Sequence, residues 1–436
     1  MRLLLTGATG LIGARLLARF AHCGHAVVCA ARRPPADLPP NCSWYRIDFA
    51  SASRADWRPC LEGVDAVVNT VGIFRERRDA SFERLHADAP RELFEACVAA
   101  GVQRVVHLSA LGADEAAQTA YHRSKRRGDA LLLALPLQAV VVQPSLVFAA
   151  DGPSARAFLA LAALPLVPLP AGGGQTVQPL HVDDAVLAIQ ALVEAPPDAP
   201  LPRRIALVGP RALSLRQYLL HLRAGLGLGR AFTVAVPKAL VDLGARLGDR
   251  LPGALLDRAA WSMLQRGNTA PADAIGALLG RPPRDASRFI APRDATDLRV
   301  GARLAWLLPV IRASLALVWI GTGIVSLGLY PLDASFELLA RAGVPAALRP
   351  AALYGAALLD LAFGVLTMLP WRGRRWLWPS QAALIIGYTA IISLRLPEFW
   401  LHPYGPLLKN LPMLALLWLL WALEPPHPKR SVSPAS

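Results

Sequence analysis

The first half of the chain alternates short apolar runs with stretches in which apolar residues recur at helical spacing. A short apolar run between polar turns is typical of a buried parallel strand, and a period near 3.6 residues indicates the helix that follows it. This alternation predicts an α/β domain built on a doubly wound parallel sheet, with helices on both faces. The expected strands cover residues 3–5, 25–31, 44–49, 65–71, 102–109 and 140–147, and two of the expected helices cover residues 11–20 and 90–100.

The pattern changes after the last of these strands, where helical stretches alternate with proline and glycine turns. Residues 178–192 predict a helix that carries Asp183 and Asp184 in its first turn, where carboxylates suit the helix dipole and would cap the helix. We expect one domain over residues 1–300, with a small α-rich substrate subdomain made mainly by residues 150–180 and 205–295.

After residue 300 the chain contains four apolar stretches with only short polar breaks between them. A helix needs about 20 residues to cross the hydrocarbon of a bilayer, and each stretch is near that length. Buried helices of a soluble core are the alternative, and the succession of four such runs disfavours it. We therefore expect an all-α domain of four transmembrane helices over residues 301–436, with spans at residues 313–330, 351–370, 376–394 and 407–423.

Composition agrees with a membrane protein, because 54% of the 436 residues are hydrophobic and ordinary soluble proteins contain fewer. The formal net charge is +15, and four of the 46 basic residues are lysines, which leaves 42 arginines. These arginines are scattered and lack interleaved aromatic residues. We therefore expect attraction to an anionic membrane surface and no binding to nucleic acid.

Five cysteines lie in the first hundred residues, and their spacing is not that of a Cys-x-x-Cys metal or redox motif. We expect them to be small core residues with free thiols in a reducing compartment, and we expect no metal site. The five are Cys23, Cys29, Cys42, Cys60 and Cys97.

A glycine-rich turn, with Gly7, Gly10 and Gly13, joins the first expected strand to the first expected helix. A strand, a glycine turn and a helix in this order are the context that a dinucleotide fingerprint requires. Gly7 permits the tight turn, Gly10 lets the backbone approach a pyrophosphate, and Gly13 lets the helix pack close to the strand. The free N–H groups at the helix start would face the phosphates. A tight turn without a ligand is the alternative, and the order of the later motifs disfavours it.

Tyr121 and Lys125 are four residues apart in the segment AYHRSK, so they share one face of a helix. Hydride transfer to a carbonyl needs a proton donor, and a phenol serves better when a nearby cation stabilises its anion. Lys125 would supply that charge and hold the nicotinamide ribose. Ser109 ends an expected strand at the same edge of the sheet, and we predict that it hydrogen-bonds the substrate oxygen.

These motifs resemble the short-chain dehydrogenase/reductase superfamily, and TGATGLIG has the glycine spacing typical of its extended members. The segments LSALGADEAAQTAYHRSK, VVVQPSLVF, PLHVDDA and GALLGRPPRD resemble an atypical branch that includes the accessory reductase-like subunit of respiratory complex I. The resemblance covers residues 1 to about 295. It implies a Rossmann fold that binds NAD(P), with an oxidoreductase or epimerase-like activity and a Ser-Tyr-Lys triad. The interval from Ser109 to Tyr121 is shorter than in sugar epimerases, which implies a shorter substrate wall.

NADP is the expected cofactor and NAD the less favoured one, because Arg32 and Arg33 stand where an NAD-binding fold places an acidic residue. The two arginines either clamp a 2′-phosphate or are ordinary surface charge. Asp48 would accept a hydrogen bond from the adenine amine, as the resemblance implies. The expected cofactor set is Gly7, Thr9, Gly10, Leu11, Ile12, Gly13, Arg32, Arg33, Asp48, Asn69, Val71, Gly72, Tyr121, Lys125, Pro144 and Ser145.

The apolar C-terminal segment resembles the DoxX-like family of small four-helix membrane domains, as the stretch HPYGPLLKNLP suggests. The loop between its second and third spans holds Arg372, Arg374 and Arg375, and the tail holds Lys429 and Arg430. Positive residues favour the cytoplasmic side of a membrane. We therefore expect a multi-pass inner-membrane protein whose N-terminal domain and C-terminus are both cytoplasmic.

Asp360 lies near the middle of the second expected span, where an ionised carboxylate is costly. We expect it to face the interior of the bundle and to pair with Lys409 of the fourth span, whose long side chain can reach deeper than its backbone. A structural ion pair, or a protonated carboxyl hydrogen-bonded to a neighbouring helix, is the favoured interpretation, ahead of a proton or quinone site.

The sequence favours a membrane-anchored, NADP(H)-dependent oxidoreductase that acts on a carbonyl, quinone or enone of an apolar molecule, a lipid or quinone drawn from the bilayer. Two alternatives stay open. One is a non-catalytic NADP-binding subunit or assembly factor of a membrane respiratory complex, and the other is a redox sensor that signals through its membrane helices. A substrate pocket beside the nicotinamide would favour the enzyme, whereas a nicotinamide face blocked by side chains would favour the subunit.

Overall fold

The computed structural model describes residues 1–77, 80–251, 254, 256–371 and 373–424. The chain divides into two compact units, Met1–Arg303 and Leu304–Ser436. Three residues used to predict the membrane topology, Arg372, Lys429 and Arg430, lie outside the described residues.

The first unit is built on a seven-stranded sheet with the strand order β11-β6-β5-β4-β1-β2-β3, and all neighbouring strands are parallel. The predicted doubly wound parallel sheet is confirmed. The order reverses between β1 and β4, where sheets of this kind bind ligands at the carboxyl ends of their strands. The strands are β1 (Arg2–Thr6), β2 (Ala26–Ala31), β3 (Cys42–Arg46), β4 (Ala66–Asn69), β5 (Arg104–Leu108), β6 (Gln138–Pro144) and β11 (Arg204–Leu207).

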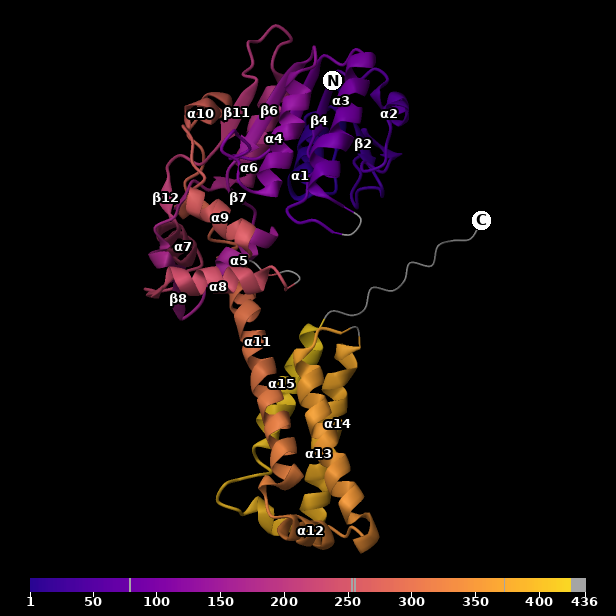
Figure 1. Ribbon diagram of the computed structural model, residues 1–436, viewed down its shortest axis with the longest axis vertical. Coiled ribbons are helices and arrows are strands. Elements are labelled where there is room, and N and C mark those ends of the chain that lie inside the picture. Colours follow the sequence, from indigo (N-terminus) through magenta and orange to yellow (C-terminus); the bar gives the residue numbers. More distant parts are fainter. Residues whose placement is uncertain (78–79, 252–253, 255, 372, 425–436) are drawn as a thin grey trace, which may run out of the picture. The chain divides into compact units, whose positions relative to one another are not determined.

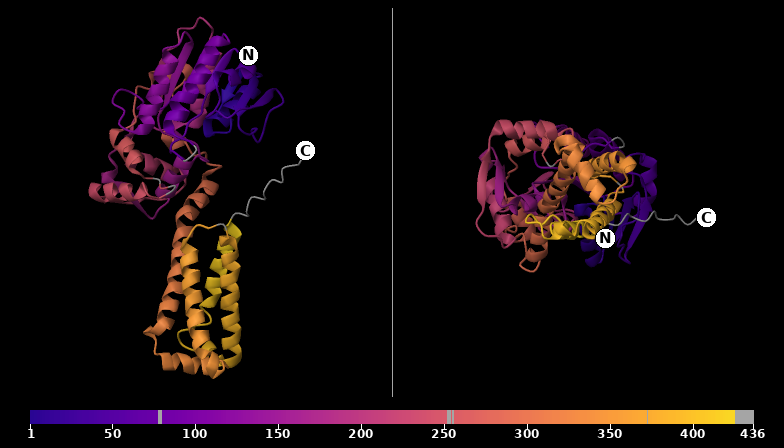
Figure 2. Two further views of the ribbon diagram at one scale, coloured as in Figure 1. Left: turned by 45° about the vertical axis from the view of Figure 1, so that its right-hand side comes forward. Right: turned by 90° about the horizontal axis from the view of Figure 1, so that it is seen from below.

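Helices cover both faces of this sheet (Figures 1 and 2) because successive side chains of each strand point to opposite faces. In β1, Leu3 and Leu5 pack into one apolar cluster and Leu4 into another. The first cluster includes side chains of α1 (Leu11–His22), α6 (Val182–Glu194) and α10 (Asp273–Leu279). The second includes side chains of α2 (Arg54–Leu61), α3 (Ala89–Ala99) and α4 (Ala120–Leu133).

Two local predictions differ from the structure. Strand β3 ends at Arg46, before the predicted end at residue 49, so Asp48 lies in the turn that follows the strand. The predicted caps of α6 are wrong, because the ring nitrogen Nδ1 of His181 accepts the first-turn N–H of Asp183 at 3.2 Å. Asp184 is fully buried and accepts instead from the Arg281 guanidinium at 2.5 Å.

The rest of the first unit packs around its own apolar cluster, which includes the buried Phe148 and Tyr218. Arg266 of this part donates to the Gly112 carbonyl at 2.9 Å and to the Asp114 carboxylate at 2.6 Å, which fastens the loop that precedes α4. The main elements are β7 (Val147–Phe148), α5 (Pro153–Ala162), β8 (Leu166–Pro170), β9 (Thr176–Val177), β10 (Leu180–His181), β12 (Leu213–Ser214), α7 (Leu215–Gly225), β13 (Phe232–Val236), α8 (Lys238–Gly248) and α9 (Arg258–Arg266).

The second unit is a bundle of apolar helices that run side by side (Figures 1 and 2). Three helical segments are long and apolar enough to cross a membrane, Ala295–Leu329, Ala346–Met368 and Arg374–Arg395. The predicted fourth span is a shorter helix of 14 residues, Asn410–Leu423. The helices are α11 (Ala295–Ile324), α12 (Leu332–Arg341), α13 (Arg349–Met368), α14 (Arg374–Arg395) and α15 (Asn410–Leu423).

Polar side chains join the helices of this bundle, but the predicted pair of Asp360 and Lys409 is wrong. Asp360 is buried in α13 and accepts a hydrogen bond from the Thr322 hydroxyl of α11 at 3.2 Å. Lys409 is exposed, because α15 begins one residue after it and leaves its side chain at the helix end. Gln381 of α14 links two other helices. Its side-chain oxygen accepts from the Trp319 indole of α11 at 3.0 Å, and its amide donates to the Thr367 hydroxyl of α13 at 2.8 Å.

We predict that Gly128→Ala destabilises the first unit. A Cβ at this position would lie 1.9 Å from the carbonyl oxygen of His86, so α4 and the π-helical turn Arg84–Asp88 would have to separate. Overpacking of this kind typically costs about 1–3 kcal/mol of unfolding free energy. Gly276→Ala in α10 is the matched control, because nothing lies within 4 Å of its added Cβ. Denaturant unfolding of the two variants should separate them, and equal stabilities would contradict the packing.

Candidate functional site

The glycine turn closes tightly between β1 and α1. Gly7 has a φ of 75°, which L side chains rarely adopt, and a Cβ there would lie 2.5 Å from the Thr70 hydroxyl. A Cβ on Gly13 would lie 2.1 Å from the Gly7 carbonyl oxygen. Both positions therefore require glycine. Helix α1 begins at Leu11 without a side-chain cap, so the N–H groups of its first turn are available to an anion.

This turn fits the pyrophosphate of a dinucleotide. A phosphate group needs close approach to the backbone and free N–H donors, and the turn offers both through Gly10 and the first turn of α1. Gly10 is exposed, as is Thr9, whereas Leu11 and Ile12 are half-buried. The turn lies at the end of β1, beside the reversal of strand order, which is where a dinucleotide binds in such a sheet.

Tyr121 and Lys125 lie one turn apart on α4, and their relative exposures are only 7% and 3%. The helix starts there because the Thr119 hydroxyl accepts the N–H of His122 at 3.2 Å, which caps its first turn. The Lys125 ammonium donates to the Leu108 carbonyl at the end of β5, at 2.9 Å. A Cβ on Gly72 would lie 3.0 Å from the Lys125 Nζ atom, so glycine at that position leaves room for the ammonium.

Burial shifts the pKa values of both Tyr121 and Lys125. It lowers the pKa of Lys125 from 10.5 to about 8, an effect that the negative charge of Asp129 partly opposes. Burial also raises the pKa of the Tyr121 phenol above its ordinary value, and Asp129 adds to this shift. The phenol therefore keeps its proton at neutral pH, and its raised pKa makes it a weaker proton donor than the sequence predicts.

Asp129 lies one further turn along α4 and is fully buried. Its Oδ2 atom accepts from the Ser109 hydroxyl at 2.8 Å and from Arg204 at 3.2 Å. Burial raises the pKa of its carboxyl from 3.8 to about 6, and the hydrogen bond from Ser109 limits the shift. The Ser109 hydroxyl, which is predicted to bind the substrate oxygen, donates its proton to Asp129 in the structure.

A chain of buried polar groups joins this carboxylate to the glycine turn. The Asn69 amide donates to Nδ1 of His107 at 3.1 Å, and its oxygen accepts from the Thr6 hydroxyl at 2.6 Å. Since Nδ1 is the acceptor, the ring proton of His107 is on Nε2, which lies 3.6 Å from the other oxygen of Asp129. Asn69 was predicted to bind cofactor, and its side chain is occupied with these internal contacts.

His86 joins the loop that follows β4 to helix α4. Its Nε2 atom accepts the N–H of Ile73 at 3.1 Å, so the ring proton is on Nδ1 and is donated to the Ser124 hydroxyl at 2.9 Å. Ser124 in turn donates to the carbonyl of Tyr121 at 2.8 Å. Burial lowers the pKa of His86 to about 3, and the nearby Lys125 adds to the shift, so the ring stays neutral.

Aromatic rings surround the Tyr121 phenol. The ring of Phe74 stacks on it with a centroid separation of 5.3 Å, and His86 meets it edge to face at 5.5 Å. Phe82 makes a further edge-to-face contact at 5.8 Å. Phe74 is itself 81% exposed, so it covers the phenol ring from the solvent side.

The other predicted cofactor residues lie around the same edge of the sheet. Arg32 and Arg33 are exposed and directly follow β2. Asp48 is exposed, and its carboxylate accepts the N–H of Ala50 at 3.1 Å. A further group lies at the ends of β4 and β6, namely Val71, Gly72, Pro144 and Ser145. In this group the Ser145 hydroxyl donates to the Gln178 carbonyl at 2.5 Å.

Residues 3–207 match the model of the NAD dependent epimerase/dehydratase family, and residues 316–418 match that of the DoxX-like family. The chain joins an epimerase/dehydratase-like domain to a DoxX-like domain. Both resemblances predicted from the sequence are thereby confirmed, and so is the NAD(P)-binding Rossmann class of the first domain. The membrane class of the second domain is confirmed as well.

Curated relatives match the first domain. The mouse mitochondrial NADH dehydrogenase [ubiquinone] 1 alpha subcomplex subunit 9 is 27% identical over 232 residues, which cover 50% of this chain and 58% of the mouse protein. A ceramide reductase of Caulobacter vibrioides is 26% identical over 196 residues, covering 44% of this chain and 61% of that enzyme. The match therefore spans less than two thirds of either relative.

Solved structures share the fold of the first domain. A nucleoside-diphosphate-sugar epimerase from Staphylococcus aureus superposes with a TM-score of 0.55 and 18% identity, covering 66% of this chain and 99% of that one. A UDP-glucuronic acid 4-epimerase from Bacillus cereus, in complex with UDP-glucuronic acid and NAD, gives a TM-score of 0.51 and 17% identity, covering 70% and 100%.

Sequence reasoning missed two residues of this site, Asp129 and His86. Asp129 could have been found, because it follows Lys125 by four residues and therefore shares its helix face. His86 could not, because its partners Ile73 and Ser124 are 13 and 38 residues away and no local pattern links them. Among the described residues, no group of three or more His, Cys, Asp or Glu side chains is placed to hold a metal ion.

We predict that Asp129→Asn changes how the stability of the first domain depends on pH. The folded state raises the pKa of this carboxyl from 3.8 to about 6, so the stability contributed by its protonated form is lost as the pH rises through that window. Relative to the asparagine variant, the native chain should lose about 2 kcal/mol of unfolding free energy between pH 4.5 and pH 7. Denaturant unfolding at the two pH values measures the difference. The exposed Asp48→Asn is the control, and a pH-independent difference between native and Asp129→Asn would refute the assignment.

Proposed function

We propose that the chain is a membrane-anchored NADP(H)-dependent oxidoreductase that transfers hydride between the nicotinamide and the carbonyl of an apolar molecule. The observation that carries the proposal is the burial of Tyr121 and Lys125 on one face of α4, at the edge of the sheet where the glycine turn lies. The pair places a protonated phenol and an ammonium group together where a nicotinamide would bind in this fold.

In the proposed reaction the bound cofactor supplies or accepts the hydride, and the protein handles the proton. Tyr121 donates its proton to the carbonyl oxygen during reduction and takes it back during oxidation. Lys125 stabilises the resulting phenolate and hydrogen-bonds the nicotinamide ribose. The Leu108 carbonyl holds the Lys125 ammonium at 2.9 Å, and the negative charge of Asp129, which accepts from Ser109 at 2.8 Å, favours the charged form of the lysine.

The preference for NADP over NAD is part of the proposal. Arg32 and Arg33 are exposed directly after β2, where a 2′-phosphate of the adenosine ribose would lie in this fold. Both side chains are exposed, so both guanidinium groups can turn toward a phosphate. Two arginines suit a phosphate because each can make paired hydrogen bonds to its oxygens.

An apolar carbonyl compound, such as a lipid or a quinone, is the substrate class that the proposal favours. The DoxX-like domain places the chain in a membrane, where such molecules are concentrated. The relative from Caulobacter vibrioides carries the name ceramide reductase, and ceramide is itself a membrane lipid. A nucleotide sugar, as bound by the Bacillus cereus enzyme, would give a membrane anchor no evident role in substrate delivery.

A second candidate function is a non-catalytic NADP-binding subunit or assembly factor of a membrane complex. The stacking of Phe74 on Tyr121 favours this alternative, because the ring covers the phenol from the solvent side. The mouse relative is named as a subunit of NADH dehydrogenase [ubiquinone]. Activity assays of Phe74→Ala separate the two candidates, because an enzyme should keep or gain turnover and a non-catalytic subunit should show none in either form.

We place the first domain and the C-terminus in the cytoplasm and the second domain in the inner membrane. Arg374 and Arg375 support this orientation, since they begin α14 at the end of the bundle where Glu424 ends α15. A loop with several arginines favours the cytoplasmic side. The activity of a reporter enzyme fused after Ser436 shows on which side of the membrane the C-terminus lies. Activity confined to the periplasmic side would overturn the placement.

We predict that Tyr121→Phe lowers turnover by about 10²-fold or more while cofactor affinity stays near that of the native chain, because only the proton donor is lost. Lys125→Ala should weaken both turnover and cofactor binding. The assay follows NADPH oxidation by the purified chain with membrane lipid and quinone extracts, and Tyr45→Phe on β3 is the matched control. Undiminished turnover in Tyr121→Phe would remove its assignment.

We predict that the double variant Arg32→Ala/Arg33→Ala binds NADPH at least about tenfold more weakly and changes NADH affinity little, because hydrogen bonds to a charged phosphate are worth about 1.5–3 kcal/mol each. Fluorescence titration with both nucleotides measures the two affinities. Arg58→Ala, an exposed arginine on α2, is the matched control. An equal loss for both nucleotides would leave Arg32 and Arg33 as ordinary surface charge.

A further inference from the structure

Helix α8 turns an apolar stripe outward. Leu240, Leu243 and Leu247 are between 50% and 58% exposed, and their spacing of three and four residues puts them on one face. The opposite face is anchored, because Val241 and Ala245 pack on the buried Trp261 of α9. The exposed leucines are therefore presented by a helix that is fixed in position, and they are not the loose end of a fraying segment.

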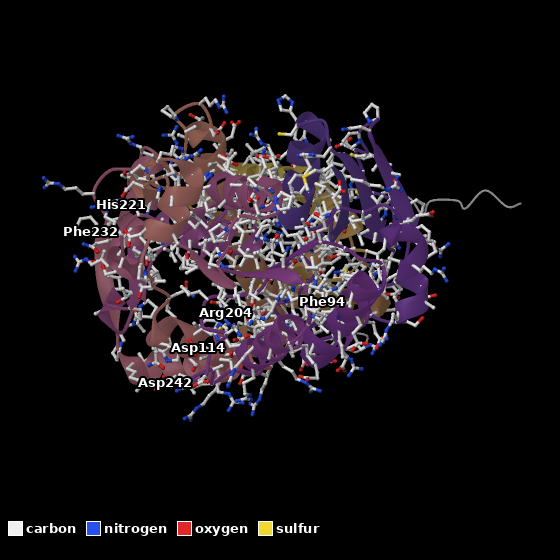
Figure 3. All side chains as sticks on the ribbon, turned by 90° about the horizontal axis from the view of Figure 1, so that it is seen from above. Phe94, Asp114, Arg204, His221, Phe232 and Asp242 are labelled. Atoms are coloured by element: carbon white, nitrogen blue, oxygen red, sulfur yellow. The ribbon has the colours of Figure 1, made fainter. Side chains whose placement is uncertain are left out.

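The strand before α8 has an apolar side that is also exposed. Phe232 of β13 is 79% exposed, and its register partner on β8, Leu166, is exposed as well. Paired residues project to the same side of a sheet, so Phe232, Val234 and Leu166 share one side, while Val167 is buried on the other. Figure 3 shows Phe232 at the outer margin of the view, in contrast to Phe94, which lies inside.

Arginines lie beside the leucine stripe of α8. A shallow cavity of about 320 Å³ next to α8 is lined by Arg246, Asp249, Arg250 and Arg258. Asp249 is paired with Arg258, so three positive charges face one negative charge in this cavity. Exposed leucines bordered by arginines are the combination that amphipathic helices use when they lie in the surface of an anionic bilayer.

We propose that α8 docks the first unit onto an anionic lipid bilayer. The docking face is defined as Leu240, Leu243 and Leu247, and it sits at the level of the acyl chain boundary, while the exposed side of β13 and β8 is a second apolar surface of the same unit. Arg246 and Arg250 contact lipid phosphates. The inference concerns binding alone and does not depend on the activity proposed above.

Two observations favour a bilayer over a protein partner as the occupant. The apolar side chains border a positive cavity, which matches anionic headgroups around a hydrocarbon surface. The same chain also continues into the apolar helical segment Ala295–Leu329, so a bilayer is always present at high local concentration. A tethered unit needs only a weak docking contact to stay on its membrane.

The test uses the full chain in lipid nanodiscs that hold one copy each. Leu243→Cys is labelled with an environment-sensitive fluorophore after the exposed Cys23 and the half-buried Cys42 are replaced by serine. Lipids that carry a nitroxide near the headgroup serve as quenchers, in discs with and without phosphatidylglycerol. Leu38→Cys, another exposed leucine of the same unit, is the matched control.

We expect the label at position 243 to be quenched several-fold more strongly than the label at position 38, and most strongly in anionic discs. Added salt, or the double variant Arg246→Gln/Arg250→Gln, should reduce that quenching, because both weaken attraction to the headgroups. Equal quenching at both positions overturns the proposal. So does a fluorescence blue shift without quenching, which indicates burial against protein, or quenching that appears only in discs with two copies, which indicates self-association.

Discussion

The site depends on two opposite charges, Lys125 and Asp129, buried one helical turn apart on α4. Burial works against both charges, since it lowers the pKa of the lysine to about 8 and raises that of the aspartate to about 6. Each relieves part of the other's desolvation, and the Leu108 carbonyl and the Ser109 hydroxyl supply the hydrogen bonds that burial removes. Because Leu108 and Ser109 belong to the end of β5, this pair also fixes where the helix docks on the sheet.

The same buried chemistry connects the helix to the glycine turn. Asn69 at the end of β4 bridges Thr6 of β1 and His107 of β5, so three neighbouring strands are tied together just below the point where the strand order reverses. Buried polar groups of this kind have few alternative partners, and a shift of any strand would leave one of them unpaired. These contacts fix the strand ends beside the turn that would hold a pyrophosphate, and His107 lies 3.6 Å from Asp129 of the helix that carries Tyr121, without a hydrogen bond between them.

The sequence predicts those features that depend on local spacing. The sheet follows from the short apolar runs, the turn from the spacing of its glycines, and the common face of Tyr121 and Lys125 from the helical period, and all three appear in the structure. The errors concern side chains that choose among distant partners. Asp360 was assigned to Lys409 by depth along two helices, but α15 begins only at Asn410, so the closer Thr322 is its partner. The hydrogen bond from Ser109 to Asp129 depends on tertiary packing too, which the spacing of residues along the chain does not specify.

Energetics give a reason to regard the Tyr121 site as functional. Burying two opposite charges near each other adds little net stability, because the loss of hydration offsets the attraction, and apolar residues of similar volume would often serve a fold as well or better. Packing alone does not explain why Lys125, which is 3% exposed, lies near the buried carboxylate of Asp129 and the buried phenol of Tyr121. Proton transfer by Tyr121 would use such an arrangement, because a desolvated lysine acts strongly on a neighbouring phenolate. The electrostatic cost concentrated at this edge of the sheet therefore favours the enzyme over the subunit, although the ring of Phe74 must then move aside to admit a substrate.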